Sequence, residues 1–225
     1  GYIGSHTCLE LLERGYGVVV IDNLCNSNPK SLDRVKQITG KDLKFYEGDV
    51  RDEALLRKIF AENEITAVIH FAGLKAVGES VQQPLKYYRN NVISLVTILE
   101  MMKKYSVKNI VFSSSCSVYG QPDAEHLPVD ETAPIQKALS PYGNTKQINE
   151  EIICDQAHAD SSLHATILRY FNPIGAHPSA MIGELPSGVP QNLLPFVTQT
   201  AAGLRAELMV FGDDYNTPDG SCIRD

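Results

Sequence analysis

The sequence lacks a long apolar run, a C-x-x-C pair and a cluster of basic residues. Because a membrane-spanning helix needs about 20 apolar residues, none is expected, and no signal-peptide pattern opens the chain. The scattered lysines and arginines and the net charge of −7 argue against binding to nucleic acid or to an anionic membrane. The five cysteines and six histidines show no metal-ligand spacing. We therefore expect reduced thiols, no metal site and a cytoplasmic location.

What the sequence does have is a regular alternation of short apolar runs with helical patterns. Its 225 residues, 43% hydrophobic and 21% charged, are typical of a globular protein with one large domain or two small ones. The alternation indicates βαβ units, so we expect an α/β fold with a Rossmann-type, doubly wound parallel sheet. A long loop is expected at 172–191. Strands are predicted at 18–21, 43–47, 65–71, 109–113, 164–169 and 207–211, and helices at 7–13, 52–63, 85–105, 141–158 and 192–204.

The first residues, Gly1-Tyr-Ile-Gly4, have the spacing of the second half of a glycine fingerprint. Glycines at these positions let a pyrophosphate approach a helix N-terminus. Asp22 ends the next predicted strand, 18 residues after Gly4. A carboxylate at that place binds an adenine-ribose diol, which favours NAD over NADP. The alternative is a turn-forming Asp before Asn23.

The two ends of the sequence are abrupt. The first half of the fingerprint, with its strand, would precede residue 1, and the chain stops at Asp225 without a terminating element. We therefore expect a piece of a longer protein. Residues 1–171 would be a NAD-binding domain without its first strand. Residues 172–225 would be part of a smaller nucleotide-sugar-binding domain, because the periodicity ends after Phe171.

Polar and small residues also follow the next three strands, where the ligands of a doubly wound sheet bind. Asp49 could bond an adenine amine or cap a helix. The turn 71–75 allows backbone contact with a cofactor, and Lys75 can reach a phosphate or ribose, although an ordinary βα turn has a similar composition. Residues 113–115 supply serine hydroxyls to the same crevice or form a plain serine-rich turn. Together these strand ends predict one ligand crevice.

A tyrosine and a lysine, Tyr142 and Lys146, lie one helical turn apart. Ser140 and Pro141 precede them as an N-cap and a first helical residue, so the pair occupies positions i and i+4 of one helix face. A free tyrosine has a pKa of about 10, and an ammonium about 4–5 Å away favours the phenolate by roughly 2–3 pK units. The pair therefore predicts a general base. The alternative is an amphipathic helix with a surface Tyr–Lys pair.

Several longer stretches carry a family resemblance that covers essentially the whole chain. They are Gly-Tyr-Ile-Gly-Ser-His-Thr (1–7), Ile-Asp-Asn-Leu (21–24), Gly-Asp-Val-Arg-Asp (48–52), His-Phe-Ala-Gly-Leu-Lys-Ala-Val-Gly-Glu-Ser (70–80), Tyr-Tyr-Arg-Asn-Asn-Val (87–92), Phe-Ser-Ser-Ser (112–115), Val-Tyr-Gly (118–120), Ser-Pro-Tyr-Gly (140–143) and Leu-Arg-Tyr-Phe-Asn-Pro-Ile-Gly-Ala-His (168–177). On these stretches the chain resembles the extended short-chain dehydrogenase/reductases that modify nucleotide sugars, and most of all their 4-epimerase group. Departures are small: Cys116-Ser117 stand where the family commonly has Ala-Thr, and the segment between Gly120 and Ser140 is slightly longer than usual.

The resemblance implies which residues bind ligands. Ser115 and Tyr142 would hold the sugar 4-hydroxyl. The UDP half would lie against Asn172, Asn192, Leu193, Phe211 and Arg224, with a planar guanidinium for the diphosphate and an aromatic face for uracil. NAD would be surrounded by Gly1, Tyr2, Ile3, Gly4, Asp22, Asn23, Asn26, Ser27, Asp49, Val50, Phe71, Ala72, Gly73, Lys75, Asn90, Ser115, Tyr142, Lys146 and Phe171.

The activity implied by the resemblance is the NAD-dependent interconversion of UDP-glucose and UDP-galactose, a step of galactose metabolism. Tyr142 as phenolate would take the proton of the 4-hydroxyl, Ser115 would bond the same oxygen, and Lys146 would hold the nicotinamide ribose. The 4-keto sugar would turn over and receive the hydride on its other face. The predicted helices 85–105 and 141–158 resemble those of the family's dimer interface, so a homodimer is expected.

Two alternatives remain open at this point. A dTDP-glucose 4,6-dehydratase, or a UDP-glucuronate epimerase or decarboxylase, shares the first oxidation step. A dehydratase needs an acidic pair soon after its Ser or Thr, whereas Cys116-Ser117 offer no carboxylate. A non-catalytic NAD-binding scaffold requires loss of a catalytic residue, whereas Ser115, Tyr142 and Lys146 are all present.

Overall fold

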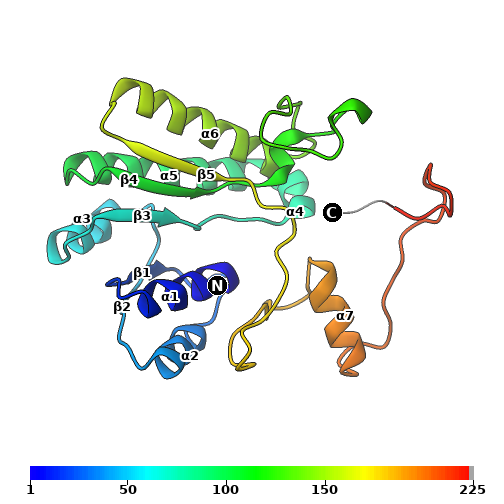
Figure 1. Ribbon diagram of the computed structural model, residues 1–225, viewed down its shortest axis with the longest axis horizontal. Coiled ribbons are helices and arrows are strands. Elements are labelled where there is room, and N and C mark those ends of the chain that lie inside the picture. The colour runs from blue at the N-terminus through cyan, green and yellow to red at the C-terminus, as the bar shows by residue number, and fades with distance from the viewer. Residues whose placement is uncertain (223–225) are drawn as a thin grey trace.

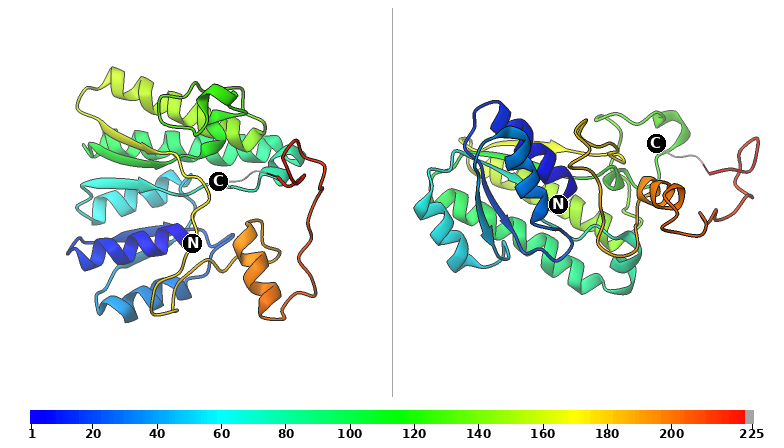
Figure 2. Two further views of the ribbon diagram at one scale, coloured as in Figure 1. Left: turned by 45° about the vertical axis from the view of Figure 1, so that its right-hand side comes forward. Right: turned by 90° about the horizontal axis from the view of Figure 1, so that it is seen from below.

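The computed structural model describes residues 1–222. Strands form the middle of the molecule, with helices on both sides (Figures 1 and 2). The strands are β1 (Val19–Asp22), β2 (Lys44–Glu47), β3 (Ala67–His70), β4 (Asn109–Ser113) and β5 (His164–Leu168). The helices are α1 (Tyr2–Glu13), α2 (Lys30–Thr39), α3 (Glu53–Glu62), α4 (Val77–Gln82), α5 (Pro84–Lys104), α6 (Pro141–Ala159) and α7 (Leu193–Ala201), with 3-10 turns η1 (Cys116–Tyr119) and η2 (Ala124–His126).

Every strand pairing is parallel, as the sequence predicts. β1 pairs with β2, and β3, β4 and β5 pair in that order. The register aligns Phe112 of β4 with His70 of β3 and Ile167 of β5, so the carboxyl ends of these three strands meet at one edge. Within residues 1–222, no strand pairs with both β1 and β3. The α/β, Rossmann-type prediction is confirmed.

Alternating side chains of β1 divide the core into two layers. Val19 and Ile21 pack on the cluster formed by α3, α5, α6 and β4, while Val20 packs on the cluster formed with α1 and α2. This is the period of two that a strand covered on both faces requires. The second cluster also contains Ile182, a residue of the long loop that is only 4% exposed. The long loop is therefore anchored on α1 and α2.

Helix ends follow the local chemistry of the sequence. Ser140 Oγ accepts a hydrogen bond of 3.1 Å from the Gly143 backbone N–H, and Pro141 is the first helical residue of α6, as predicted. Asp52 caps α3 through Oδ1, which accepts bonds from Ala54 (2.9 Å) and Leu55 (3.1 Å). A capped, correctly started α6 is what fixes the position of Tyr142.

The main differences from the predicted secondary structure lie in α1, α2, α4 and residues 207–211. α1 begins at Tyr2 rather than at residue 7, so the glycine turn is itself helical. α2 and α4 were not predicted, because α2 has no side-chain N-cap and α4 has only 6 residues. The strand predicted at 207–211 is wrong. No other segment of the described chain pairs with it, and a strand needs such a partner for its backbone groups.

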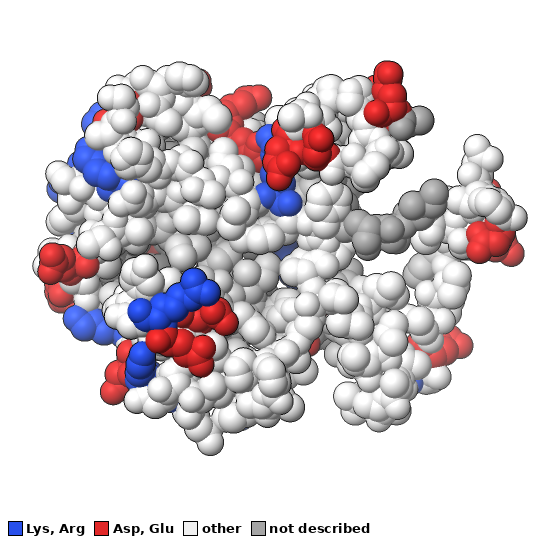
Figure 3. Space-filling model, in the orientation of Figure 1, with Lys and Arg blue, Asp and Glu red and all other residues white. Residues whose placement is uncertain are grey.

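The described surface is mixed in charge. On the face shown in Figure 3, basic side chains lie in small separate groups, several beside acidic ones, and form no extended basic patch. None of the helices within residues 1–222 is long and apolar enough to cross a bilayer.

Candidate active site

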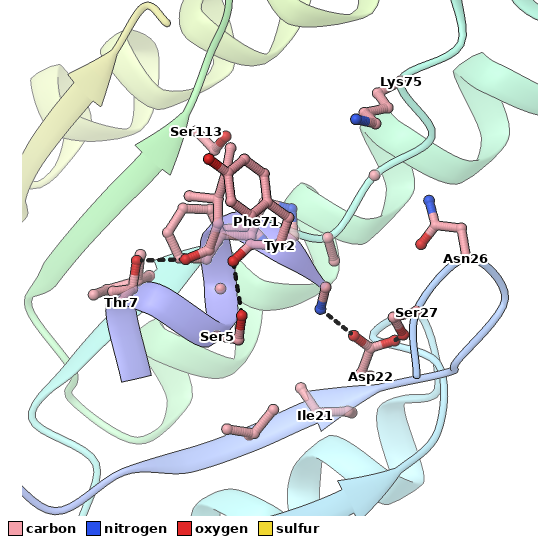
Figure 4. Close-up of a pocket in the computed structure, with 18 of the residues that line it drawn as sticks. Tyr2, Ser5, Thr7, Ile21, Asp22, Asn26, Ser27, Phe71, Lys75 and Ser113 are labelled. Carbon is pink, nitrogen blue, oxygen red and sulfur yellow. Dashed lines mark hydrogen bonds and ion pairs between the residues drawn. The ribbon is translucent and has the colours of Figure 1, made fainter. Parts of the chain in front are cut away.

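One large cavity extends between β1 and β3 along their length and continues past the carboxyl ends of the strands to the start of α1 (Figure 4). Every residue predicted to surround the cofactor lines it, as do Asn172 and Asn192 of the predicted substrate half. Their individual roles stay predictions. Leu193 and Phe211 are exposed, at 67% and 80%, and are not among the lining residues. Arg224 lies outside the described residues.

The start of α1 offers backbone N–H groups to this cavity. No side chain caps the helix after Gly1. The hydroxyls of Ser5 and Thr7 donate back to the carbonyls of Tyr2 (2.8 Å) and Ile3 (3.0 Å), so they do not compete for the free N–H groups. An uncapped helix start beside small residues suits an anion such as a phosphate.

Asp22 lies next to that helix start (Figure 4). Its Oδ1 accepts bonds of 2.8 Å from the Leu24 N–H and from the Ser27 hydroxyl, which is the turn-forming role considered for it. Its Oδ2 lies 3.4 Å from the Gly1 nitrogen, on the cavity side. The turn bonds use Oδ1 only, so the ribose-binding role predicted for Asp22 stays a prediction that the turn does not oppose.

Asp49 is held by a neighbouring arginine. Its two oxygens accept bonds from Arg51 Nε (2.8 Å) and Nη2 (2.7 Å), and Oδ2 also accepts from Asn23 Nδ2 at 3.1 Å. The hydrogen bonds to Arg51 hold the pKa of Asp49 well below its usual range. The helix-capping role considered for Asp49 belongs to Asp52 instead. Asp49 is therefore a fixed anion at the cavity wall.

The turn after β3 is clamped by Asn91, a residue the sequence did not point to. Asn91 Oδ1 accepts from the Leu74 N–H at 2.8 Å, and its Nδ2 donates to the Leu74 carbonyl (2.9 Å) and to Thr145 Oγ1 (3.1 Å). A Cβ on Gly73 would lie 3.4 Å from the same Asn91 oxygen. Asn91 thus ties the cofactor-side turn to α6, next to Lys146.

Lys146 is a buried ammonium, 7% exposed. Its Nζ donates to the Ser113 carbonyl at 2.6 Å and lies 4.9 Å from the ring centroid of Phe112. Burial lowers the pKa of Lys146 to about 8, and the charge of Glu150 acts in the opposite direction. At neutral pH the side chain remains largely charged and points toward residues 113–115, the serine segment.

Tyr142 is in a different state from the one expected. Burial raises the pKa of the phenol, the hydrogen bond with Ser115 lowers it, and Cys116 contributes in the raising direction. Lys146 Nζ is 5.9 Å from the ring centroid and is directed to Ser113. The net pKa of Tyr142 is therefore raised in this structure, whereas a lowered pKa is expected from the neighbouring ammonium, because desolvation of the ring is the largest effect.

The serines after β4 have separate tasks. Ser115 caps η1, its Oγ accepting from the Ser117 N–H (3.2 Å) and hydroxyl (2.9 Å), so the plain-turn reading is partly correct. It also interacts with Tyr142. Ser114 points the other way and donates to the carboxylate of Glu150. The segment thus joins the cavity to the interior behind it.

Glu184 is a further cavity residue that the sequence did not point to. Its Oε1 accepts from Asn192 Nδ2 at 2.5 Å and lies 3.7 Å from Lys75 Nζ. It therefore connects a residue predicted to bind the cofactor with one predicted to bind UDP. No local motif could have found it, because its partners lie 109 and 8 positions away and only the folded loop brings them together.

Comparisons with known proteins agree with this geometry. The family model described as GDP-mannose 4,6 dehydratase matches residues 1–225. Curated relatives named UDP-glucose 4-epimerase are 59% identical in Haemophilus influenzae and 54% identical in Mus musculus, and each alignment covers 100% of this chain and 66% of the relative. The chain thus spans about two thirds of the length of these relatives.

Solved structures give the same result. The UDP-glucose 4-epimerase of Bifidobacterium longum in complex with NAD+ and UDP is 53% identical with a TM-score of 0.96, covering 100% of this chain and 67% of that one. The enzyme from Stenotrophomonas maltophila, with bound NAD and formylated UDP-arabinopyranose, is 49% identical with a TM-score of 0.93, covering 100% and 66%. The chain therefore belongs to the extended short-chain dehydrogenase/reductase family, in the group of the UDP-glucose 4-epimerases.

Proposed function

We propose that the whole protein interconverts UDP-glucose and UDP-galactose by transient oxidation at C4, with NAD as its bound cofactor. The observation that carries the proposal is that Ser115, Tyr142 and Lys146 line the same cavity as the residues predicted for the cofactor and for UDP. The names of the relatives and the NAD and UDP in the matched structures support the same activity.

The chemistry of the cavity fits NAD. The uncapped start of α1 suits the pyrophosphate, and Lys75 adds a cation at the wall. The cavity-side oxygen of Asp22 can accept hydrogen bonds from a ribose diol. It would repel a 2′-phosphate, which favours NAD over NADP. A bound NAD would supply a reversible hydride acceptor for C4 and a positive charge that favours the phenolate form of Tyr142.

The protein's own side chains handle the proton. Tyr142 as phenolate takes the proton of the sugar 4-hydroxyl and later returns it. Ser115 bonds the same oxygen and steadies the phenol. Lys146 supplies a buried positive charge on the same helix, which becomes more favourable as the phenolate forms. Because the oxidation is reversed on the other face of the sugar, the net reaction is an isomerisation.

The other open readings are weaker. Cys116 and Ser117, which follow Ser115, carry no carboxylate for a dehydratase. A scaffold without catalysis would not need a buried lysine beside a tyrosine in a ligand cavity, since burying an ammonium is costly.

We also propose a cytoplasmic homodimer. None of the five cysteines forms a disulfide, which fits a reducing compartment. Val81 (60% exposed), Leu85 (81%) and Ile93 (45%) place apolar side chains on the outer side of α4 and α5, where a second copy can cover them. Sedimentation of the whole protein measures this directly, and a monomer at micromolar concentration would contradict it.

The activity is tested by incubating the whole protein with UDP-galactose and no added NADH. Formation of UDP-glucose, with no net change in NADH absorbance, is the expected result. A 4-keto-6-deoxy product would indicate a dehydratase. Ligand binding with no turnover would indicate a scaffold. Either result would overturn the proposal.

A further inference from the structure

A buried group of charges lies behind the wall of the active-site cavity. Glu150 of α6 is 4% exposed and accepts three bonds from Arg169, one from Nη2 at 2.8 Å and two from Nε at 3.2 and 3.3 Å. Arg169 Nη1 donates to the Tyr119 hydroxyl at 3.1 Å, and its guanidinium stacks 4.9 Å from the centre of that ring. Ser114 donates to the same carboxylate. Of these residues only Ser114 lines the cavity. The sequence predicts that its hydroxyl, with those of Ser113 and Ser115, faces the crevice, whereas the hydroxyl donates to Glu150.

A gain in folding stability does not by itself explain why Glu150 and Arg169 form a buried ion pair. Removing two charges from water costs several kcal/mol per ion, and a buried ion pair can often be replaced by apolar side chains without loss of stability. The pair of Glu150 and Arg169 joins α6 to the chain after β5, where apolar packing is available from Ile153 and Ile167. A role beyond packing is therefore worth seeking in what the pair holds.

What it holds is the serine segment. Ser114 stands between Ser113, whose carbonyl binds Lys146 Nζ, and Ser115, which interacts with Tyr142. The backbone of the segment is tied on both sides of Arg169, because Ser114 N donates to Leu168 O and Cys116 N donates to Tyr170 O, each at 2.8 Å. Glu150 thus holds the serine segment in place through its bonds to Ser114 and Arg169. Tyr142 and Lys146 of α6 face this segment.

Glu150 also lies one helical turn after Lys146, on the same face of α6. Lys146 takes part in no ion pair within residues 1–222, so nearby anions act on it only across a gap. The other titratable groups shown to face Lys146 are Tyr142 on α6, whose ring centroid lies 5.9 Å from Nζ, and His70 on β3, whose pKa the ammonium lowers. Tyr87 on α5 and Cys116 on η1 interact electrostatically with Tyr142, and Arg169 after β5 is paired with Glu150. Glu79 is already bonded to Lys86 and Tyr87.

We propose that Glu150, held by Arg169 and Ser114, is a positioning residue for the reaction. It fixes the serine segment against α6, and its negative charge keeps Lys146 protonated as the phenolate of Tyr142 forms. The proposal rests on the proposed function, because it assigns Glu150 a part in the work of Tyr142 and Lys146.

The test is Glu150→Gln in the whole protein with its bound cofactor. Glutamine keeps the size and can still bond Ser114, but it removes the charge. We expect kcat to fall about tenfold or more while KM for UDP-galactose changes less than about twofold, because the lost charge acts on Lys146 and the phenolate in the transition state and not on the substrate contacts. The basic limb of the kcat–pH profile should move to lower pH by roughly half a unit or more, because loss of an anion disfavours the ammonium.

Two further variants separate the effect of the charge of Glu150 from the effect of its hydrogen bond to the serine segment. Glu150→Asp keeps the charge, so it should leave the basic limb in place while lowering kcat. Ser114→Ala keeps the ion pair and should do the same. If Glu150→Gln fails to fold, these two variants still decide, since a wild-type kcat in both would overturn the proposal. The matched control is Glu151→Gln, which makes the same charge change at the next, exposed position of α6 and should change neither kcat nor the limb.

Other outcomes contradict the inference. Glu150→Gln could lower the melting temperature and leave both kcat and the basic limb of the kcat–pH profile unchanged. That result would give Glu150 a structural role only. An equal shift of the limb in Glu151→Gln would show a general charge effect. Wild-type turnover of UDP-galactose decides the proposed function separately. If the wild-type protein does not turn over UDP-galactose, the pKa of the Tyr142 phenol can be measured instead, as the difference between absorbance titrations of the protein with and without Tyr142→Phe. That pKa must then change in Glu150→Gln and stay unchanged in Glu151→Gln.

Discussion

Residues 1–171 and residues 172–222 contain apolar side chains of the same kinds but bury them very differently. In the first region Leu95 and Ile153 are 0% and 1% exposed, within a core of helices packed on parallel strands. In the second, Leu185 and Phe211 are each 80% exposed, and α7 is the only helix among its described residues. The side chains proposed to be catalytic therefore stand on elements that pack within residues 1–171, whereas the described chain covers little of the region predicted to bind UDP.

The cavity shows the same contrast. On the cofactor side, Asp22, Asp49 and Lys146 are each held by two or more contacts within the first region. On the sugar-nucleotide side, Asn192 is bonded to Glu184 of its own region, and Phe211 is outside the cavity wall. Substitutions in the two regions should therefore differ in their effects on turnover, cofactor binding and the free energy of unfolding.

The largest effect is expected at the proposed base. Tyr142→Phe in the whole protein should lower kcat about 10³-fold, because the hydroxyl that moves the proton is gone. NAD binding should be kept, since the cofactor contacts lie on other strand ends. The measurement is the rate of UDP-glucose formation from UDP-galactose. A variant with near-normal turnover would remove Tyr142 from the mechanism.

The second effect is on stability. Leu56→Ala should lower the free energy of unfolding by about 2–5 kcal/mol, because Leu56 is 1% exposed and the cavity left behind cannot fully collapse. The matched change Leu185→Ala should cost less than about 0.5 kcal/mol. Both are read from chemical denaturation of the whole protein. An equal cost at Leu185 would show that contacts outside residues 1–222 bury it.

The third effect concerns cofactor choice. Asp22→Asn can keep the turn bonds to Leu24 and Ser27 but loses the charge on the cavity-side oxygen. NAD should bind about tenfold more weakly, since a hydrogen bond to a charged group is worth about 1.5–3 kcal/mol. Discrimination against NADP should narrow. Fluorescence titration with both cofactors measures this, and unchanged affinities would assign Asp22 to the turn alone.

The smallest effect is a pH dependence of stability. Burial, with a contribution from Lys146, lowers the pKa of His70 to about 3. An unfolded chain binds the same proton with a pKa of about 6.5, so stability is complete above that value and falls at lower pH by about 1.4 kcal/mol per unit. His70→Gln should flatten this decline between pH 6 and 5, as followed by denaturation at each pH. A parallel decline in both proteins would exclude His70 as its source.

The sequence predicted the parts of this structure that are coded locally. Ser140 and Pro141 start α6 by a cap and a fixed φ, and the strand ends carry their polar residues within a few positions. Glu150 and Asn91 could not be found in that way, because their partners Arg169 and Leu74 are 19 and 17 positions away. The raised pKa of Tyr142 was also beyond the sequence, since it depends on how deeply the fold buries the ring.

The burial of Ile182 affects where a protease can cleave the chain. The loop around it is fastened to the first region by the apolar cluster of α1 and α2 and by Arg34 Nη1, which donates to the Met181 carbonyl at 2.9 Å. Cleavage needs an extended, accessible segment, and the stretch that follows α7 offers one around Leu204 and Val210, 77% and 81% exposed. Brief digestion of the 225-residue chain should therefore cut there first and leave residues 176–184 attached to the elements that carry Tyr142.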